Sequence, residues 1–151
     1  MRRNLTAGTV ARLVAAQFPH CAHLPVTAVT EGGWDNCTFR LGENLVARLP
    51  SAEAYVAQVE KEHRWLPILA PHLPLPIPEP VAMGSPDDGF RYPWSIYRWI
   101  DGEPASTAPT PKVTELARDL AGFLGALYAI EAGNGPILGR HNFSRGGSLD
   151  V

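Results

Sequence analysis

The strongest restriction on the fold of this chain comes from proline, which stands at every second position from Pro74 to Pro80. Proline has no backbone N–H, and its ring clashes with the preceding helical turn, so this stretch must be extended and polyproline-like. Most of the 15 prolines fall in three clusters, at residues 67–80, 86–93 and 104–111. The clusters divide the 151 residues into short elements without repeats or low-complexity sequence, and they do not indicate disorder.

Before the proline run we expect two helices with a small sheet between them. A helix over 6–18 carries an apolar stripe and begins at Thr6, whose side chain suits an N-cap. Ser51 is expected to cap a second helix over 52–69. Short strand-like runs separated by tight turns predict an antiparallel meander between the helices; they cover 26–30, 37–41 and 45–49.

After the proline run we expect two more strands and a long helix. The strands cover 81–84 and 91–100, and the acidic, glycine-containing loop 86–89 joins them as a hairpin. Thr110 and Pro111 predict a helix start, followed by an apolar stripe at helical spacing that stops by Gly133. The predicted fold class is α+β, with one antiparallel sheet of about five strands and a helix inserted after the third strand.

Bulk composition excludes several classes of protein. The chain is 45% hydrophobic and 19% charged, as in ordinary soluble globular proteins. A net charge of −2 without a basic block argues against a nucleic-acid partner. No apolar run approaches the roughly 20 residues that a membrane span needs. Two cysteines make no disulfide framework, and we expect a cytoplasmic protein.

One residue breaks the pattern of the second helix. Glu62 falls on the apolar stripe that is otherwise made by Tyr55, Val59, Leu66 and Leu69. A carboxylate that faces a packed surface needs a cation, or its burial costs several kcal/mol. Arg48 interrupts the third strand on the face opposite Leu45, Ala47 and Leu49, and is the nearest candidate. The competing interpretation is a boundary residue whose carboxylate reaches water.

A basic residue on a third strand and a carboxylate on the next helix form the arrangement with which protein-kinase-like folds hold nucleotide phosphates. Several motifs in this chain, in this order, resemble the aminoglycoside phosphotransferase family of kinase-like enzymes. The resemblance covers about 24–149, and the motifs that carry it are 31–42, 45–50, 73–80, 94–103 and 126–128. It implies a kinase-like N-terminal lobe over 1–100, followed over 101–151 by a hinge or linker and the first helix of an incomplete C-terminal lobe.

The resemblance also implies a nucleotide site. A glycine turn would cover the phosphates, Arg48 would contact phosphate while Glu62 orients it, and backbone groups of a hinge would bind the purine. A plain β-turn and a buried aromatic strand are the competing interpretations of the turn and the hinge. The residues implied are Gly32, Gly33, Asn36, Arg48, Glu62, Tyr97, Arg98, Trp99 and Ile100.

The resemblance does not extend to the catalytic segment. The family uses a His-Gly-Asp-type motif with a downstream Asn and a further Asp for metal, and none of the aspartates here stands in such a context. The full enzyme would use ATP or GTP with Mg²⁺ and a small-molecule acceptor with a hydroxyl. We expect this piece, which lacks catalytic and metal residues, to bind nucleotide at most and not to turn over.

Two other hypotheses come from the same sequence. A lobe whose cleft face lacks its partner exposes apolar surface, which would suit a non-catalytic module that self-associates or binds another chain. The third hypothesis is a degenerate remnant without function. A zinc site at His20, Cys21 and His23 is disfavoured, because adjacent ligands do not easily share one tetrahedral ion and no Cys-x-x-Cys pair is present.

Overall fold

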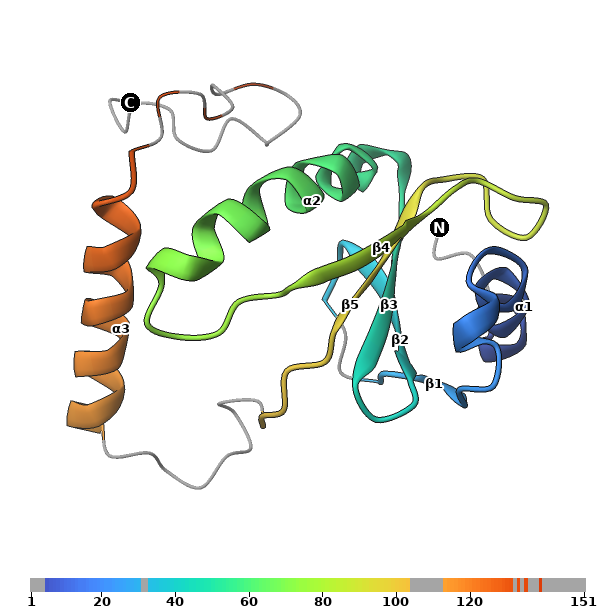
Figure 1. Ribbon diagram of the computed structural model, residues 1–151, viewed down its shortest axis with the longest axis horizontal. Helices are drawn as coiled ribbons and strands as arrows, with labels where there is room; N and C mark the ends of the chain where they lie inside the picture. Colours follow the sequence, from blue (N-terminus) through green and yellow to red (C-terminus); the bar gives the residue numbers. More distant parts are fainter. Residues whose placement is uncertain are drawn as a thin grey trace.

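The structure is a computed structural model that describes residues 5–30, 33–103, 113–131, 133, 135 and 139 (Figure 1). Within these ranges, three α-helices and five strands follow one another in the order expected from the sequence. They are α1 (Ala7–Gln17), β1 (Val26–Ala28), β2 (Asn36–Leu41), β3 (Leu45–Pro50), α2 (Ala57–Leu69), β4 (Pro80–Gly84), β5 (Trp94–Arg98) and α3 (Val113–Tyr128). The division of the chain at residue 100 stays a prediction.

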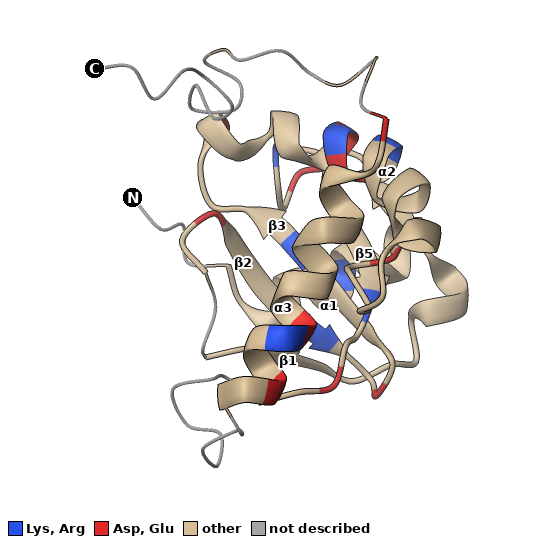
Figure 2. Cartoon of the chain, turned by 90° about the vertical axis from the view of Figure 1, so that its left-hand side faces the viewer, with Lys and Arg blue, Asp and Glu red and all other residues tan. Residues whose placement is uncertain are grey.

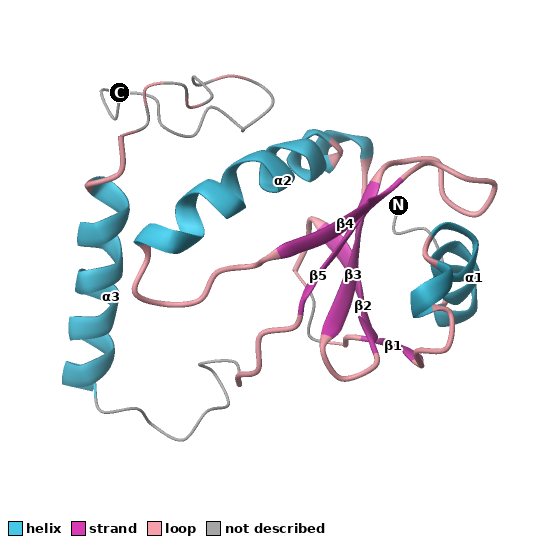
Figure 3. Cartoon of the chain, in the orientation of Figure 1, coloured by secondary structure: helices cyan, strands magenta, loops and turns pink. Residues whose placement is uncertain are grey.

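The five strands form one antiparallel sheet in the order β1-β2-β3-β5-β4 (Figure 3). The first three strands are the expected meander. The last two form a hairpin whose second strand, β5, lies beside β3, with Val46 opposite Tyr97 and Arg48 opposite Ser95. The α+β class with a helix inserted after the third strand is therefore confirmed.

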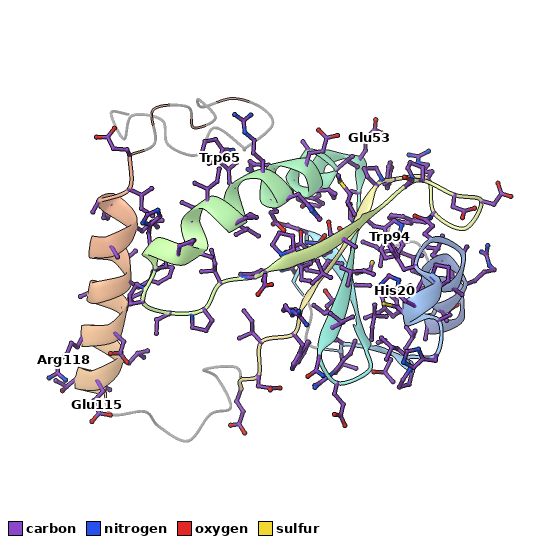
Figure 4. The ribbon with its side chains drawn as sticks, viewed as in Figure 1. His20, Glu53, Trp65, Trp94, Glu115 and Arg118 are labelled. Carbon is purple, nitrogen blue, oxygen red and sulfur yellow. The ribbon has the colours of Figure 1, made fainter. Side chains whose placement is uncertain are left out.

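The sheet has one face in the core and one face toward α2. The core face packs on α1, whose Val10, Leu13 and Val14 are buried together with Leu49 and Trp94. Figure 4 shows Trp94 between the sheet and α1. Because side chains alternate along a strand, the neighbours of these core residues on β3 and β5 point to the other face.

Helix α1 forms as expected. The Thr6 hydroxyl accepts a hydrogen bond from the Thr9 amide at 3.2 Å, which satisfies one of the free amides of the first turn. The helix ends at Gln17, with Phe18 as its C-cap and Pro19 next.

The start of α2 differs from the expectation that Ser51 caps it. A short 3₁₀ turn over Glu53–Tyr55 comes first, and α2 begins at Ala57 without a side-chain cap. The Ser51 hydroxyl donates instead to the Trp34 carbonyl at 2.6 Å, and so ties the start of this segment to the turn before β2. The Ser51 cap was wrong because a tertiary acceptor competes with the local one.

Strand β5 is shorter than the expected 91–100. Pro93 has no N–H to donate to a neighbouring strand, and the strand begins directly after it at Trp94. At its other end the ladder stops at Arg98.

Helix α3 carries the expected apolar stripe, but the stripe is exposed. Five members have exposed fractions from 36% to 71%, namely Val113, Leu116, Leu120, Leu124 and Leu127. The sixth, Phe123, is half-buried. The charges of α3 lie near its beginning, at Glu115, Arg118 and Asp119, and the rest of the helix is uncharged (Figure 2). The predicted start at Thr110 and Pro111 lies outside the described residues. Among the helices that are described, none has the length and apolarity to cross a membrane.

Candidate functional site

An ion pair joins β3 to α2 on the face of the sheet away from α1. The Arg48 Nη1 atom lies 3.2 Å from the Glu62 Oε2 atom. Both side chains are about three-quarters buried, with 27% and 26% of their surface exposed. The alternation of β3 turns Arg48 away from the core and the apolar stripe of α2 turns Glu62 inward, so the predicted pair forms.

Tyr97 on β5 contacts both members of the ion pair. Its hydroxyl donates a hydrogen bond of 2.6 Å to the same Glu62 oxygen, and the Arg48 guanidinium carbon lies 5.0 Å from the centre of its ring. Burial, and then the hydrogen bond to Glu62, raise the pKa of Tyr97 far above its ordinary value, so the hydroxyl keeps its proton. Sequence reasoning assigned Tyr97 to the hinge but missed this contact, because no sequence signal places β5 beside β3.

Two adjoining cavities open beside this pair. The first has a volume of about 190 Å³ and runs along β5 to the segment after it; the second, about 330 Å³, lies under the turn before β2. Thr38 and Arg48 line both, so Arg48 stands where the two meet. The remaining lining residues are Val46, Pro78, Tyr97, Arg98, Trp99 and Ile100 in the first, and Gly33, Trp34, Asp35 and Asn36 in the second.

Residues 26–147 of the chain match the phosphotransferase enzyme family. The chain belongs to that family. No curated protein matches it. Its kinase-like fold is shared with solved structures of phosphotransferases, and the fold inferred from the resemblance is thereby confirmed.

Three of these phosphotransferase structures show how far the similarity extends. The GDP complex of wild-type aminoglycoside 2'-phosphotransferase-IIIa is 24% identical, with a TM-score of 0.77 over 91% of this chain and 48% of that one. A macrolide 2'-phosphotransferase type I is 25% identical, with a TM-score of 0.54 over 89% and 48%. The streptomycin–ATP ternary complex of APH(2'')-IIa is 23% identical, with a TM-score of 0.56 over 85% and 41%. This family member spans less than half the length of these relatives.

In the hinge expected at 97–100, few backbone amides are free to hydrogen-bond a ligand. The Arg98 amide donates to the Glu79 carbonyl and the Trp99 amide to the Asn44 carbonyl, both at 2.9 Å. Two contacts hold the Trp99 ring. The Arg40 guanidinium carbon lies 4.3 Å from the ring centre, and the indole N–H donates a hydrogen bond of 2.9 Å to Asp101 Oδ1. Within the described part of the chain no hydrogen bond engages the Ile100 amide, and this residue lines the first cavity.

The glycine turn is described only in part. Gly32 lies outside the described residues, while Gly33 and Asn36 line the second cavity. A Cβ built on Gly33 would meet no atom of the described residues within 4 Å, so packing against those residues does not demand glycine there. In the described ranges no group of three or more His, Cys, Asp or Glu side chains could hold a metal ion.

His63 follows Glu62 on α2 and gives this site a predicted pH dependence. Its Nε2 lies 3.0 Å from the Ser95 hydroxyl, and burial lowers its pKa below the ordinary 6.5 although the Glu62 charge opposes the shift. At a pH between the lowered pKa of His63 in the folded chain and its ordinary pKa of 6.5 in the unfolded chain, the unfolded chain binds more protons. The contribution of His63 to the free energy of unfolding is therefore fully present above pH 6.5 and is lost as the pH falls below it.

We therefore expect the midpoint temperature of unfolding to decrease as the pH is lowered from about 7.5 to about 5. The variant His63→Gln should show a smaller decrease. The exposed His72 provides the control variant, His72→Gln. Differential scanning calorimetry at matched ionic strength measures both. An unchanged pH slope in His63→Gln would contradict the assignment.

Proposed function

We propose that this chain is the nucleotide-binding part of a phosphotransferase that moves the γ-phosphoryl group of ATP or GTP onto a hydroxyl of a small molecule. The observation that carries the proposal is the Arg48–Glu62 pair at the junction of two cavities. Relatives of similar fold were solved with GDP, ADP or ATP, which supports a nucleotide ligand.

The geometry suggests how a nucleotide would lie. The first cavity is lined by Val46, Pro78 and Ile100 among others, an apolar surrounding that would suit a purine base. The second is lined by Gly33, Asn36 and Arg48, whose polar groups would suit phosphates. Glu62 pairs with the guanidinium through Nη1, and the other N–H groups of Arg48 would be left to bind phosphate.

The phosphoryl-transfer step itself needs groups for which this chain has no sequence motif. A base for the acceptor hydroxyl and carboxylates for Mg²⁺ recur in kinase-like enzymes, and positioning with electrostatic stabilisation supplies nearly all of the catalysis. Bound Mg²⁺ would neutralise charge on the phosphates. We infer that the chain alone, in the cytoplasm, binds nucleotide without turnover, and that the complete enzyme acts on an aminoglycoside or a related small alcohol, as the names of its relatives suggest.

Nucleotide titration tests the proposal. We expect ADP or GDP to bind the parent chain in isothermal titration calorimetry, and Arg48→Ala to weaken the binding about tenfold or more, because a charge-assisted contact to phosphate is lost. Arg64→Ala removes the same charge from α2 at an exposed position and should leave the affinity unchanged. If neither nucleotide binds, or if both variants bind like the parent, the proposal fails.

The exposed stripe of α3 favours a second candidate function, a non-catalytic module that pairs with another copy of itself. Five aliphatic side chains on one helix, without charges over its second half, form the kind of surface that is usually covered. Size-exclusion chromatography with light scattering separates the candidates. A strictly monomeric, folded chain at high micromolar concentration would count against self-association.

A further inference from the structure

Glu62 receives contacts from two different strands on one oxygen. The Arg48 guanidinium reaches Oε2 from β3 at 3.2 Å, and the Tyr97 hydroxyl reaches the same atom from β5 at 2.6 Å. Tyr97 is almost completely buried, with 2% of its surface exposed. A hydrogen bond from a neutral hydroxyl to a carboxylate is shorter and stronger than one between neutral groups, and burial strengthens it further.

The next residue of α2 holds the same strand. The His63 Nε2 atom lies 3.0 Å from the hydroxyl of Ser95, which is itself 1% exposed, and the His63 and Tyr97 rings lie 6.0 Å apart. Successive residues of the helix therefore contact alternate residues of β5. Because both contacts depend on one register between α2 and β5, the helix cannot turn or slide without losing both.

Tyr97 also supports the cation of the pair. The Arg48 guanidinium carbon lies 5.0 Å from the centre of the Tyr97 ring, a distance at which a cation is attracted to the aromatic face. The tyrosine thus contacts both members of the ion pair, one through its hydroxyl and the other through its ring.

We propose that Tyr97 is a positioning residue, whose hydroxyl holds the Glu62 carboxylate and thereby aims the Arg48 guanidinium at the phosphates of a bound nucleotide. This inference rests on the proposed function. It assigns to β5 a part in phosphate binding that acts through Glu62 and not by contact with the phosphates.

The competing role for Tyr97 is a plain wall of the first cavity, which it also lines. The two roles differ in which part of the nucleotide they affect. A wall residue acts on the base, whereas a residue that positions Arg48 acts on the phosphates only.

Tyr97→Phe removes the hydroxyl and keeps the ring, and it separates the two roles. We expect it to weaken binding of ADP or GDP, whichever the parent binds more tightly, by about three- to tenfold, the loss that one hydrogen bond brings. Binding of the matching nucleoside, measured by competition, should change by less than about twofold.

Tyr92→Phe is the matched control. The Tyr92 hydroxyl also has a 2.6 Å hydrogen bond to a charged residue, from Arg91, but Tyr92 packs toward the core that contains α1. Its loss should leave both affinities at the parent values. Unchanged affinities for both diphosphate and nucleoside in Tyr97→Phe would overturn the proposal in favour of the wall, and equal losses for both ligands would overturn it as well.

A double-mutant cycle that combines Tyr97→Phe with Glu62→Ala tests whether Tyr97 acts through the Glu62 carboxylate. In that background Tyr97→Phe should change diphosphate affinity by less than about twofold, because no carboxylate remains to be held. A full-sized effect there would overturn the proposal. If Glu62→Ala does not fold, Arg48→Ala replaces it with the same expectation.

The two levels of hypothesis can fail separately. A parent chain that binds neither ADP nor GDP would contradict both the proposed function and this inference. A parent that binds, loses affinity in Arg48→Ala and keeps it in Tyr97→Phe sinks only the role of Tyr97.

Discussion

Leu13→Ala is expected to lower the free energy of unfolding by about 2–5 kcal/mol, the cost of deleting a large side chain from a packed core. Leu13 lies on α1 with 1% of its surface exposed, in the cluster that α1 forms with the core face of the sheet. The helix precedes the family match, which begins at residue 26, yet it covers that face. Urea denaturation followed by circular dichroism measures the change.

Leu120→Ala is the control with the same chemical change. Leu120 lies on α3 with 52% of its surface exposed, and removing it should alter the free energy of unfolding by no more than about 0.5 kcal/mol. Similar losses for the two variants would mean either that α1 is not part of the core or that the stripe of α3 is covered.

Gly84→Ala is the second large effect that we expect, a destabilisation of about 1–3 kcal/mol. A Cβ at residue 84 would lie 2.1 Å from the Trp94 Cε2 atom, closer than non-bonded atoms approach. Trp94 is fully buried and cannot move aside without disturbing the core. The glycine on β4 is there because the indole across the ladder occupies the space of a side chain.

Two further variants isolate this clash. Gly125→Ala adds the same methyl group on α3, where no atom of the described residues lies within 4 Å. Alanine favours the helix, so this variant should be neutral or stabilising by up to about 1 kcal/mol. Trp94→Phe, which also removes a buried indole N–H without a partner in the described residues, should reduce the cost of Gly84→Ala. Additive effects of the two changes in thermal unfolding would contradict the contact.

Much of the site could be predicted along the chain. The alternation of β3 placed Arg48 on the face opposite the apolar residues, and the spacing of α2 placed Glu62 inward; both follow from the fixed geometry of one element. A buried carboxylate needs a cation, and the resemblance to kinase-like phosphotransferases paired Glu62 with Arg48. The Ser51 cap failed because the hydroxyl had a choice of partners, and only the folded chain offered the Trp34 carbonyl.

Periodicity along the chain was enough to predict the helices and strands and the faces on which Arg48 and Glu62 lie, because it acts within a single helix or strand. Only the packed fold places β5 beside β3, and this brings Tyr97 to Glu62 and His63 to Ser95. The same packing gives the Arg98 and Trp99 amides hydrogen-bond acceptors within the protein. Strand order and long-range hydrogen bonds depend on which surfaces meet when the whole core packs, and no local pattern encodes that.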